Sequence, residues 1–262
     1  LLVPDVVRAV MEYAAQKDKI SRVYLSTNGL GLNDEWFEFL KGYPKGVLTL
    51  SMDGAPDAHR RNRRALDGLP DSYDHVVSLM PQLMKTPRVV VTQTIPPSTA
   101  NRALENFQHL RDLGFWRFNF LPGYYIPWKD NQIASLQEGF RGISEAIRES
   151  WRKGEKLYIR NLFTWAPTPF FNSGLVVDSD GAIHPTNMGL SGSLDHTLED
   201  TRVGDLDHPP TREELEKGAE RVNSLLEEHL SERVMTSTRR VDEELTLFCR
   251  GLYAAHSVVA PP

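Results

Sequence analysis

The chain has 262 residues, of which 40% are hydrophobic and 25% charged, as in a globular protein with one large α/β domain or one domain and an appendage. The net charge of -5 and the isoelectric point near 5.9 argue against a broad nucleic-acid-binding surface, and no apolar run is long enough to span a bilayer. Neither a nucleic acid nor a membrane is therefore expected as a partner. The single cysteine excludes an internal disulfide and favours a cytoplasmic protein.

The first half of the chain predicts strands and helices in alternation. Apolar, β-branched runs predict four strands, over residues 22–26, 46–51, 88–95 and 116–121. Apolar residues at helical spacing predict four helices before and between these strands, over residues 3–16, 34–40, 73–84 and 101–113. Pro81 is expected to kink the third of these helices. This alternation is typical of βαβ units and a parallel sheet.

The second half predicts a different architecture. Three long helices are expected, over residues 131–153, 211–232 and 242–256. Residues 161–171 are rich in aromatics and prolines, which favours a loop. Residues 175–184 predict a β-hairpin, because two apolar runs flank Asp178-Ser179-Asp180-Gly181.

Polar residues follow directly on the apolar runs in the first half. In a parallel α/β barrel, reactive groups lie at the carboxyl ends of the strands. The candidates at those ends are Thr27, Asn28, Ser51, Asp53, Thr92, Gln93, Thr94, Asn119 and Pro122. Turn and cap chemistry favours the same residue types, so this clustering by itself leaves a structural role open.

Two motifs carry a family resemblance. The segment Ser51-Met52-Asp53-Gly54, with His59 and Arg63, resembles the S-x-D-G-x4-H-x3-R pattern of peptide-modifying radical S-adenosylmethionine (radical SAM) enzymes. The hairpin over 172–186, with Val203-Gly204-Asp205-Leu206, resembles their C-terminal SPASM or twitch extension. The resemblance implies an α/β fold: a partial (βα) barrel, similar to a TIM barrel, with about four parallel strands over residues 1–130. A helical linker and a small α+β extension are expected over 131–262.

The same resemblance implies chemistry. In the family, a 4Fe-4S cluster donates an electron to S-adenosylmethionine (SAM), and the resulting 5′-deoxyadenosyl radical abstracts a hydrogen atom from the substrate. A peptide or protein side chain is the implied substrate, and no catalytic residue is assigned. The residues expected to bind SAM are Ser51, Asn28, Arg63, Thr92 and Thr94.

The chain departs from the family pattern at the cluster. The family holds its 4Fe-4S cluster with C-x3-C-x2-C, whereas this chain has only Cys249, near its far end. Thr186 stands where the extension of the family has a cysteine, and threonine supplies no thiolate for a second cluster. By resemblance the chain begins after the second barrel strand, so the cluster motif is expected upstream. We therefore expect this fragment alone to be inactive, with no metal site of its own.

Three alternatives remain open from the residues. The chain is a non-catalytic peptide-binding or scaffold module derived from the same barrel, or an unrelated closed α/β barrel that uses Asp53, His59 and Asn119. His184, Asp195, His196 and His208 suggest a metal site, but their spacing is unlike that of zinc sites and favours scattered polar residues. Cys249 lies on an apolar helix stripe and is expected in the core. An exposed sheet edge at residues 23–26 predicts self-association.

Overall fold

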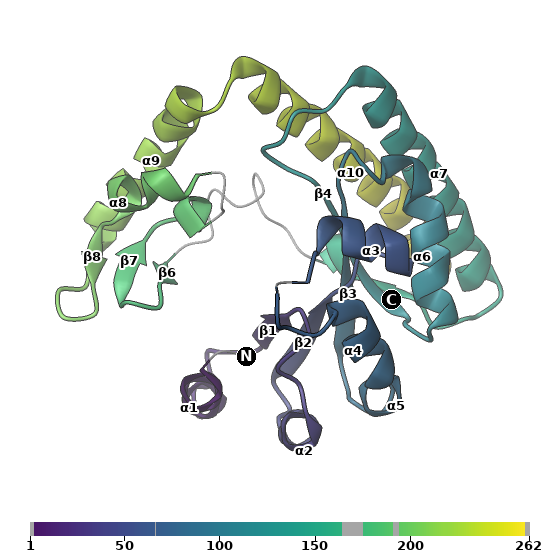
Figure 1. Cartoon of the computed structure of the whole chain (residues 1–262), viewed down its shortest axis with the longest axis horizontal. Helices are drawn as coiled ribbons and strands as arrows, with labels where there is room; N and C mark the ends of the chain where they lie inside the picture. The colour runs from purple at the N-terminus through teal and green to yellow at the C-terminus, as the bar shows by residue number, and fades with distance from the viewer. Residues whose placement is uncertain (1–2, 66, 164–174, 191–193, 260–262) are drawn as a thin grey trace. The chain divides into compact units, whose positions relative to one another are not determined.

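The computed structural model describes residues 3–65, 67–163, 175–190 and 194–259 (Figure 1). Its contacts divide the chain into two compact units. The first comprises residues 1–123, 129–163 and 243–262, and the second residues 124–128 and 164–242. The sequence predicts one domain boundary near residue 130, which stays a prediction, whereas both units draw on more than one stretch of chain.

The first unit is built on a parallel sheet whose strands lie in chain order. Its strands are β1 (Val23–Thr27), β2 (Gly46–Ser51), β3 (Val89–Ile95), β4 (Arg117–Pro122) and β5 (Tyr158–Ile159). Every neighbouring pair is parallel. The four predicted strands are confirmed, and β5 was missed because two residues are too few to show a period. Within the described residues β1 and β5 end the sheet, which contradicts the closed-barrel alternative.

Helices follow the strands, as the alternation predicts. In the first unit they are α1 (Pro4–Ala15), α2 (Asp34–Gly42), α3 (Pro56–Asn62), α4 (Ser72–Ser78), α5 (Met80–Leu83), η1 (Ala100–Arg102), α6 (Ala103–Asp112), α7 (Asp130–Arg152) and η2 (Arg160–Phe163). Pro81 follows the break between α4 and α5, where a single kinked helix was expected. The short helix α3, which begins at Pro56, was not predicted.

One face of the sheet packs against helices and forms the core. The side chain of Phe107 on α6 lies edge-on to Phe118 of β4, with ring centroids 4.9 Å apart. Leu48, Leu50 and Met52 of β2 and the following turn are at most 1% exposed on this face. Glycines let α7 approach α6: a Cβ atom on Gly139 would lie 2.7 Å from that of Ala103 (Figure 1). We call the opposite face of the sheet the inner face, because its residues alternate with these core residues.

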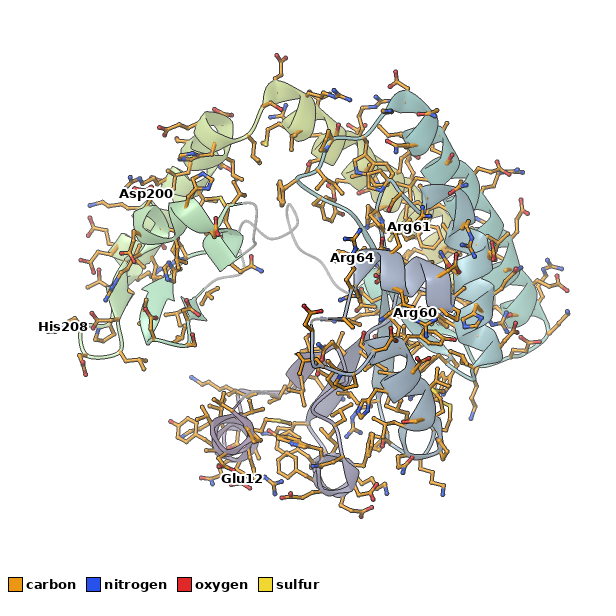
Figure 2. All side chains as sticks on the ribbon, in the orientation of Figure 1. Glu12, Arg60, Arg61, Arg64, Asp200 and His208 are labelled. Atoms are coloured by element: carbon orange, nitrogen blue, oxygen red, sulfur yellow. The ribbon has the colours of Figure 1, made fainter. Side chains whose placement is uncertain are left out.

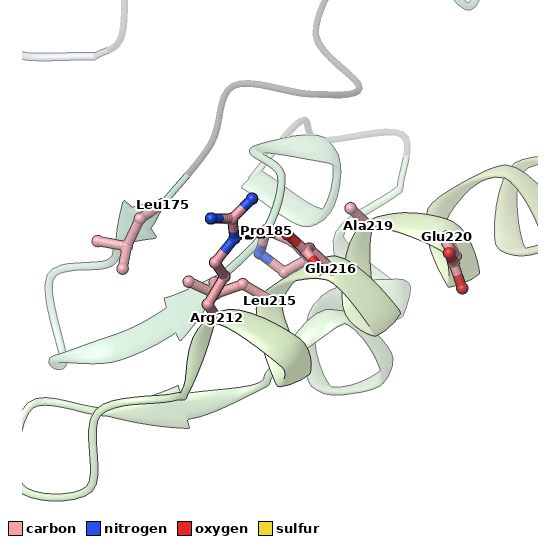
Figure 3. A pocket seen from close by; sticks show the side chains of 7 residues that line it. All are labelled: Leu175, Pro185, Arg212, Leu215, Glu216, Ala219 and Glu220. Carbon is pink, nitrogen blue, oxygen red and sulfur yellow. Dashed lines mark hydrogen bonds and ion pairs between the residues drawn. The ribbon is translucent and has the colours of Figure 1, made fainter.

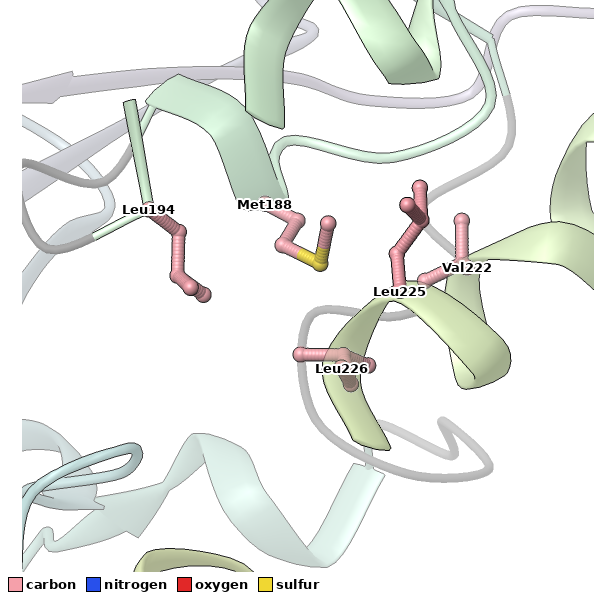
Figure 4. Packing of buried hydrophobic residues seen from close by; sticks show 5 residues of the cluster. All are labelled: Met188, Leu194, Val222, Leu225 and Leu226. Carbon is pink, nitrogen blue, oxygen red and sulfur yellow. The ribbon is translucent and has the colours of Figure 1, made fainter. Parts of the chain in front are cut away.

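The second unit contains the predicted hairpin. Strands β6 (Val176–Val177), β7 (Ala182–His184) and β8 (Gly204–Asp205) form an antiparallel sheet. Short helices η3 (Met188–Leu190), η4 (Asp195–Thr197) and α8 (Leu198–Thr201) precede α9 (Arg212–His229). The core of the unit is a cluster of apolar residues from η3, α9 and Leu194, shown in Figure 4: Met188, Leu194, Val222, Leu225 and Leu226. The loop predicted over 161–171 lies outside the described residues from 164 onward.

The last helix is longer than the sequence predicts. Helix α10 (Glu232–Val259) begins at Glu232 rather than near residue 242. The hydroxyl of Ser231 accepts a hydrogen bond from the backbone N–H of Val234 (3.4 Å), which helps to start the helix at this point. Phe248 of α10 is buried, whereas Cys249 is half-buried and not in the core as expected. Among the described helices, none is long and apolar enough to cross a membrane.

Candidate functional site

Strand register brings three of the candidate polar residues side by side on the inner face. Ser51 of β2 pairs with Thr92 of β3, and Thr92 pairs with Asn119 of β4. The side-chain amide of Asn119 donates to the Thr92 hydroxyl (3.4 Å), and all three residues are half-buried. The three side chains therefore form a polar row across three adjacent parallel strands, at the carboxyl end of β2 and in the middle of β3 and β4.

The structure places Asn28 next to this row but gives it a local role. It lies one residue beyond β1 and is exposed, and its side-chain oxygen accepts from the backbone N–H of Leu30 (3.1 Å). The preceding hydroxyl of Thr27 accepts from the N–H of Gly29 (3.1 Å), whose φ of 91° requires glycine. These contacts are those of a tight turn, and no contact of Asn28 with the polar row is present.

Arg63 is held by a buried carboxylate. Its Nε and Nη2 donate to the two oxygens of Asp53 at 3.0 and 3.1 Å, which is a bidentate pair. The Asp53 side chain is 2% exposed, and that of Arg63 is 29% exposed. The same Nη2 also donates to the hydroxyl of Thr94 (3.3 Å), and the N–H of Thr94 donates back to Asp53 (3.2 Å). The planar fork expected to meet an anionic ligand is thus engaged by Asp53.

His59 extends this network into the core. It is fully buried, and its Nδ1 accepts from the backbone N–H of Asp53 (3.4 Å). Since Nδ1 accepts, Nε2 carries the proton and donates to the hydroxyl of Ser72 (2.8 Å). Burial lowers the pKa of His59, so the ring is neutral at neutral pH. We call Asp53, His59, Arg63, Ser72 and Thr94 the rim network.

The turn after β2 allows a close approach that the sequence does not reveal. Gly54 has a φ of 138°, and a Cβ atom there would lie 2.2 Å from the side chain of Asn106 on α6. The side-chain oxygen of Asn106 accepts from the N–H of Ala55 (3.1 Å), which satisfies a donor at the start of α3. Gly54 and Asn106 thereby fix where Asp53 and α3 lie.

The positive charges of the arginine-rich segment after this turn are partly neutralised by nearby carboxylates. Arg60, Arg61 and Arg64 are exposed (Figure 2). Arg60 forms ion pairs with Asp71 (3.0 Å) and Asp74 (2.8 Å) across α3 and α4. Exposed pairs of this kind contribute little to stability, so the run is mainly a solvated surface of α3.

The polar residues suggested as a metal site are not gathered together. Among the described residues, no three His, Cys, Asp or Glu side chains lie close enough to hold a metal ion. Buried His184 contacts the hydroxyl of Thr201 (3.0 Å), while exposed His196 lies 3.2 Å from a ring nitrogen of His229. Within this chain the single thiol, Cys249, is on α10, so its residues do not fit the ligand set of an iron–sulfur cluster.

The second unit has a cavity of about 360 Å³ beside α9 (Figure 3). Its lining is formed entirely by residues of that unit: Leu175, Pro185, Arg212, Leu215, Glu216, Ala219 and Glu220. The Arg212 Nε lies 2.7 Å from Glu216, and both side chains are largely exposed. None of these residues was predicted to have a function, and the cavity contains no cluster of buried polar groups that would mark a reaction site.

Comparison with known proteins identifies the fold. No protein-family model matches the chain, and no curated protein matches it. Among solved structures, histidine-tagged anSMEcpe with bound AdoMet, an anaerobic sulfatase-maturing enzyme, is 17% identical with a TM-score of 0.68, and the match covers 97% of this chain and 77% of that one. Native anSMEcpe with bound AdoMet and the Cp18Cys peptide is 18% identical with a TM-score of 0.69, over 97% and 82% of the two chains.

At such low identity the likeness establishes the architecture and not the activity. The α/β partial barrel that the family resemblance implied is confirmed by the parallel sheet and by these structures. This chain has the same partial (βα) barrel fold as these structures, with a C-terminal extension.

Proposed function

We propose that this chain is the C-terminal portion of a radical SAM enzyme that abstracts hydrogen from a peptide or protein side chain. The observation that carries the proposal is the polar row of Ser51, Thr92 and Asn119, aligned by register on three parallel strands. The two similar structures, solved with AdoMet and in one case with a peptide, support it by analogy of fold.

In this proposal the polar row binds SAM. The hydroxyl groups of Ser51 and Thr92 both donate and accept, which suits the ribose hydroxyls and the amino-acid group of the cofactor. Thr94 is already bonded to Arg63, so we assign it, with Arg63, to positioning the turn after β2. Asn28 has exposed donors that are not used in its turn, and it contributes from the neighbouring strand end.

The chain alone is proposed not to cleave SAM. A 4Fe-4S cluster takes several thiolates, and this sequence contains one cysteine. Cluster ligands would therefore come from residues outside this chain, and the residues described here bind and orient the cofactor and exclude water.

The engaged fork of Arg63 favours a second candidate, a non-catalytic peptide-binding module. If Asp53 permanently occupies that guanidinium, the rim lacks the cation expected for the carboxylate of SAM. Calorimetric titration of the purified chain separates the two candidates, with SAM in one arm and a cysteine-containing peptide in the other. Binding of the peptide without binding of SAM would favour the module.

The enzyme proposal predicts that SAM binds and that Ser51→Ala weakens binding about tenfold, which is the effect of losing one hydrogen bond to a charged or polar ligand. The matched control is Ser78→Ala, on the exposed end of α4, where the hydroxyl bonds only the carbonyl of His75. No SAM binding by the wild-type chain, or an equal loss in both variants, would overturn the proposal.

A further inference from the structure

Arg117, the first residue of β4, is a half-buried cation on the inner face. No described carboxylate lies within ion-pair distance of it, and none of the undescribed residues is Asp or Glu. Its guanidinium carbon lies 3.4 Å from the centroid of the Trp116 ring. A stacked aromatic ring stabilises a cation but leaves its N–H donors free to bond elsewhere.

This arrangement is costly for the unliganded protein. Burial lowers the pKa of Arg117, and the neighbouring charge of Arg88 adds to the effect. Arg88 has its own donors on the backbone carbonyls of Gly46 (2.7 Å) and Tyr43 (3.0 Å) and brings no carboxylate to the region. Two cations thus lie close together without an acid, which disfavours the folded state unless an anion is bound.

Strand register puts two hydroxyl-bearing residues level with Arg117, one on the neighbouring strand and one two strands away. Tyr158 of β5 is its register partner, and burial raises the pKa of that phenol, so it remains a donor at neutral pH. On the other side, Val90 separates it from Thr49 of β2. The Thr49 side chain is 5% exposed, and its hydroxyl has no hydrogen-bond partner among the described residues. Buried polar groups of this kind are rare unless a ligand or water completes them.

The same cluster is close to the proposed cofactor row. Arg117 lies two residues before Asn119 on one strand and on the same face, a separation of about 7 Å along the strand. A peptide whose reacting residue lies next to SAM at the polar row could therefore reach Arg117 with the side chain of a nearby residue.

We propose that Arg117 anchors a carboxylate-binding site on the inner face, with Tyr158 and Thr49 as hydrogen-bond donors. Resting on the proposed function, this assigns the substrate to peptides that carry an acidic side chain near the modified residue. A guanidinium fork matches the two oxygens of a carboxylate, and phosphate shares that chemistry. The test therefore distinguishes an acidic peptide from free phosphate.

The experiment is a calorimetric titration of the whole chain without SAM, so that its outcome is independent of cofactor binding. The probes are acetyl-Glu-Ala-Glu-amide, the matching Gln peptide and inorganic phosphate, all at one ionic strength. The acidic peptide should bind at least about tenfold more tightly than the Gln peptide, as expected for a charge-assisted pair.

Arg117→Gln should abolish that preference, and Arg117→Lys should retain part of it, because lysine keeps the charge without the fork. Thr49→Val should weaken the binding of the acidic peptide a few-fold. The matched control is Arg141→Gln, because Arg141 is exposed on α7 and already paired with Glu138 and Glu145.

Equal binding of the Glu and Gln peptides, or an unchanged preference in Arg117→Gln, would overturn the proposal. Binding of phosphate without the acidic peptide would also overturn it, in favour of a free-anion site. If the acidic peptide binds as expected but SAM does not, the proposed enzyme function fails and the carboxylate site remains. Thermal unfolding of each variant shows whether it is folded.

Discussion

Arg63 and Arg117 project from the same partial barrel but meet opposite surroundings. Arg63 donates from Nε and Nη2 to the two carboxylate oxygens of Asp53, which also accepts from the backbone N–H of Thr94. Arg117, equally a half-buried guanidinium, has an aromatic ring beneath it and no carboxylate among the described residues. The charge of Arg63 is therefore paired with a carboxylate of the protein, whereas the charge of Arg117 would be paired only when an anion binds.

The arginine within the family-like motif and the arginine proposed to bind a ligand are therefore different residues. The segment that most resembles the family contains the arginine whose donors are used to hold the turn after β2. The arginine with free donors is at the start of β4, where no motif points to it. A guanidinium that the fold already satisfies stabilises the protein, whereas an unsatisfied one costs stability and gains affinity for a ligand.

The largest effect on stability should come from a substitution at Gly54, in the turn that positions Asp53 and the rim network. Gly54→Ala should lower the free energy of unfolding by about 3–5 kcal/mol, because it combines a strained φ with overlap against Asn106. Chemical denaturation measures the change. The matched control is Gly68→Ala, which also has a positive φ (81°) but nothing within 4 Å of the new methyl group, and it should cost about 1 kcal/mol.

The double variant Gly54→Ala, Asn106→Gly sharpens this test. The Asn106 Cβ is the atom closest to the added methyl group (2.2 Å), so removing the whole side chain relieves the overlap, and the double variant should be less destabilised than the sum of the two single variants. A Gly54→Ala protein as stable as the wild type would mean that the turn does not hold the rim network in place.

The second effect compares the two arginines directly. Arg63→Met should destabilise the protein by about 2–3 kcal/mol, because it leaves the buried Asp53 without its cation. We expect less than the full cost of breaking a buried pair, since Arg63 is 29% exposed and partly screened by water. Arg117→Met should raise stability slightly, by less than about 1 kcal/mol, since it removes a half-buried charge that has no carboxylate partner among the described residues.

Urea denaturation of both variants at one pH measures the difference. If Arg117→Met proves as costly as Arg63→Met, then Arg117 has a structural partner and the distinction between the two cations fails. The m-values should match the wild type, so that the change in midpoint reports stability alone.

The third effect is a pH dependence of folding stability that arises from His59 in the rim network. His59 is neutral in the folded state because burial lowers its pKa, whereas in the unfolded chain it titrates near its ordinary value of about 6.5. The unfolded state therefore binds more protons in the range below about pH 6.5, and stability falls as the pH falls toward the lower folded pKa. Protonation would also put an N–H on Nδ1, facing the N–H of Asp53.

Replacing His59 by Gln should remove this contribution. The stability difference between the wild type and His59→Gln, measured by denaturation at pH 7.5, 6.5 and 5.5, should shrink as the pH falls. Ser78→Ala is the control, because it removes an exposed hydroxyl bonded only within its own helix and no titratable group, and it should leave the pH dependence unchanged. A difference that stays constant over this range would contradict the assignment of His59 as a buried neutral acceptor.

Residue patterns predicted most of what positions the polar row. Strand runs separated by helices implied a parallel sheet with these polar residues on neighbouring strands, and the register that aligns Ser51, Thr92 and Asn119 in one row comes from the structure. The pairing of Asp53 with Arg63 could not be predicted, because it depends on the path of α3, which a seven-residue basic segment with no apolar stripe does not signal.

Features that depend on distant residues were missed for the same reason. The two-residue strand β5 forms only because β4 is beside it, and its pairing is what puts Tyr158 next to Arg117. The side chain of Asn161 binds both the N–H (2.8 Å) and the carbonyl (2.9 Å) of Phe120, but no local pattern indicates it. Only the tertiary structure shows which cation has a partner.

The smallest effect on folding stability is expected at β1. This strand is one edge of the five-stranded sheet, and β5 is the other. An end strand presents unpaired backbone groups and tends to pair with another chain. We predict that the isolated polypeptide self-associates and that Ser26→Lys, at an exposed position of β1, shifts it toward the monomer while changing unfolding free energy by less than about 0.5 kcal/mol. Sedimentation velocity measures the association, with Ser78→Lys on α4 as the control. If the wild type sediments as a single monomer at all concentrations, then this strand is protected from pairing, and the open side of the partial barrel is not an association surface.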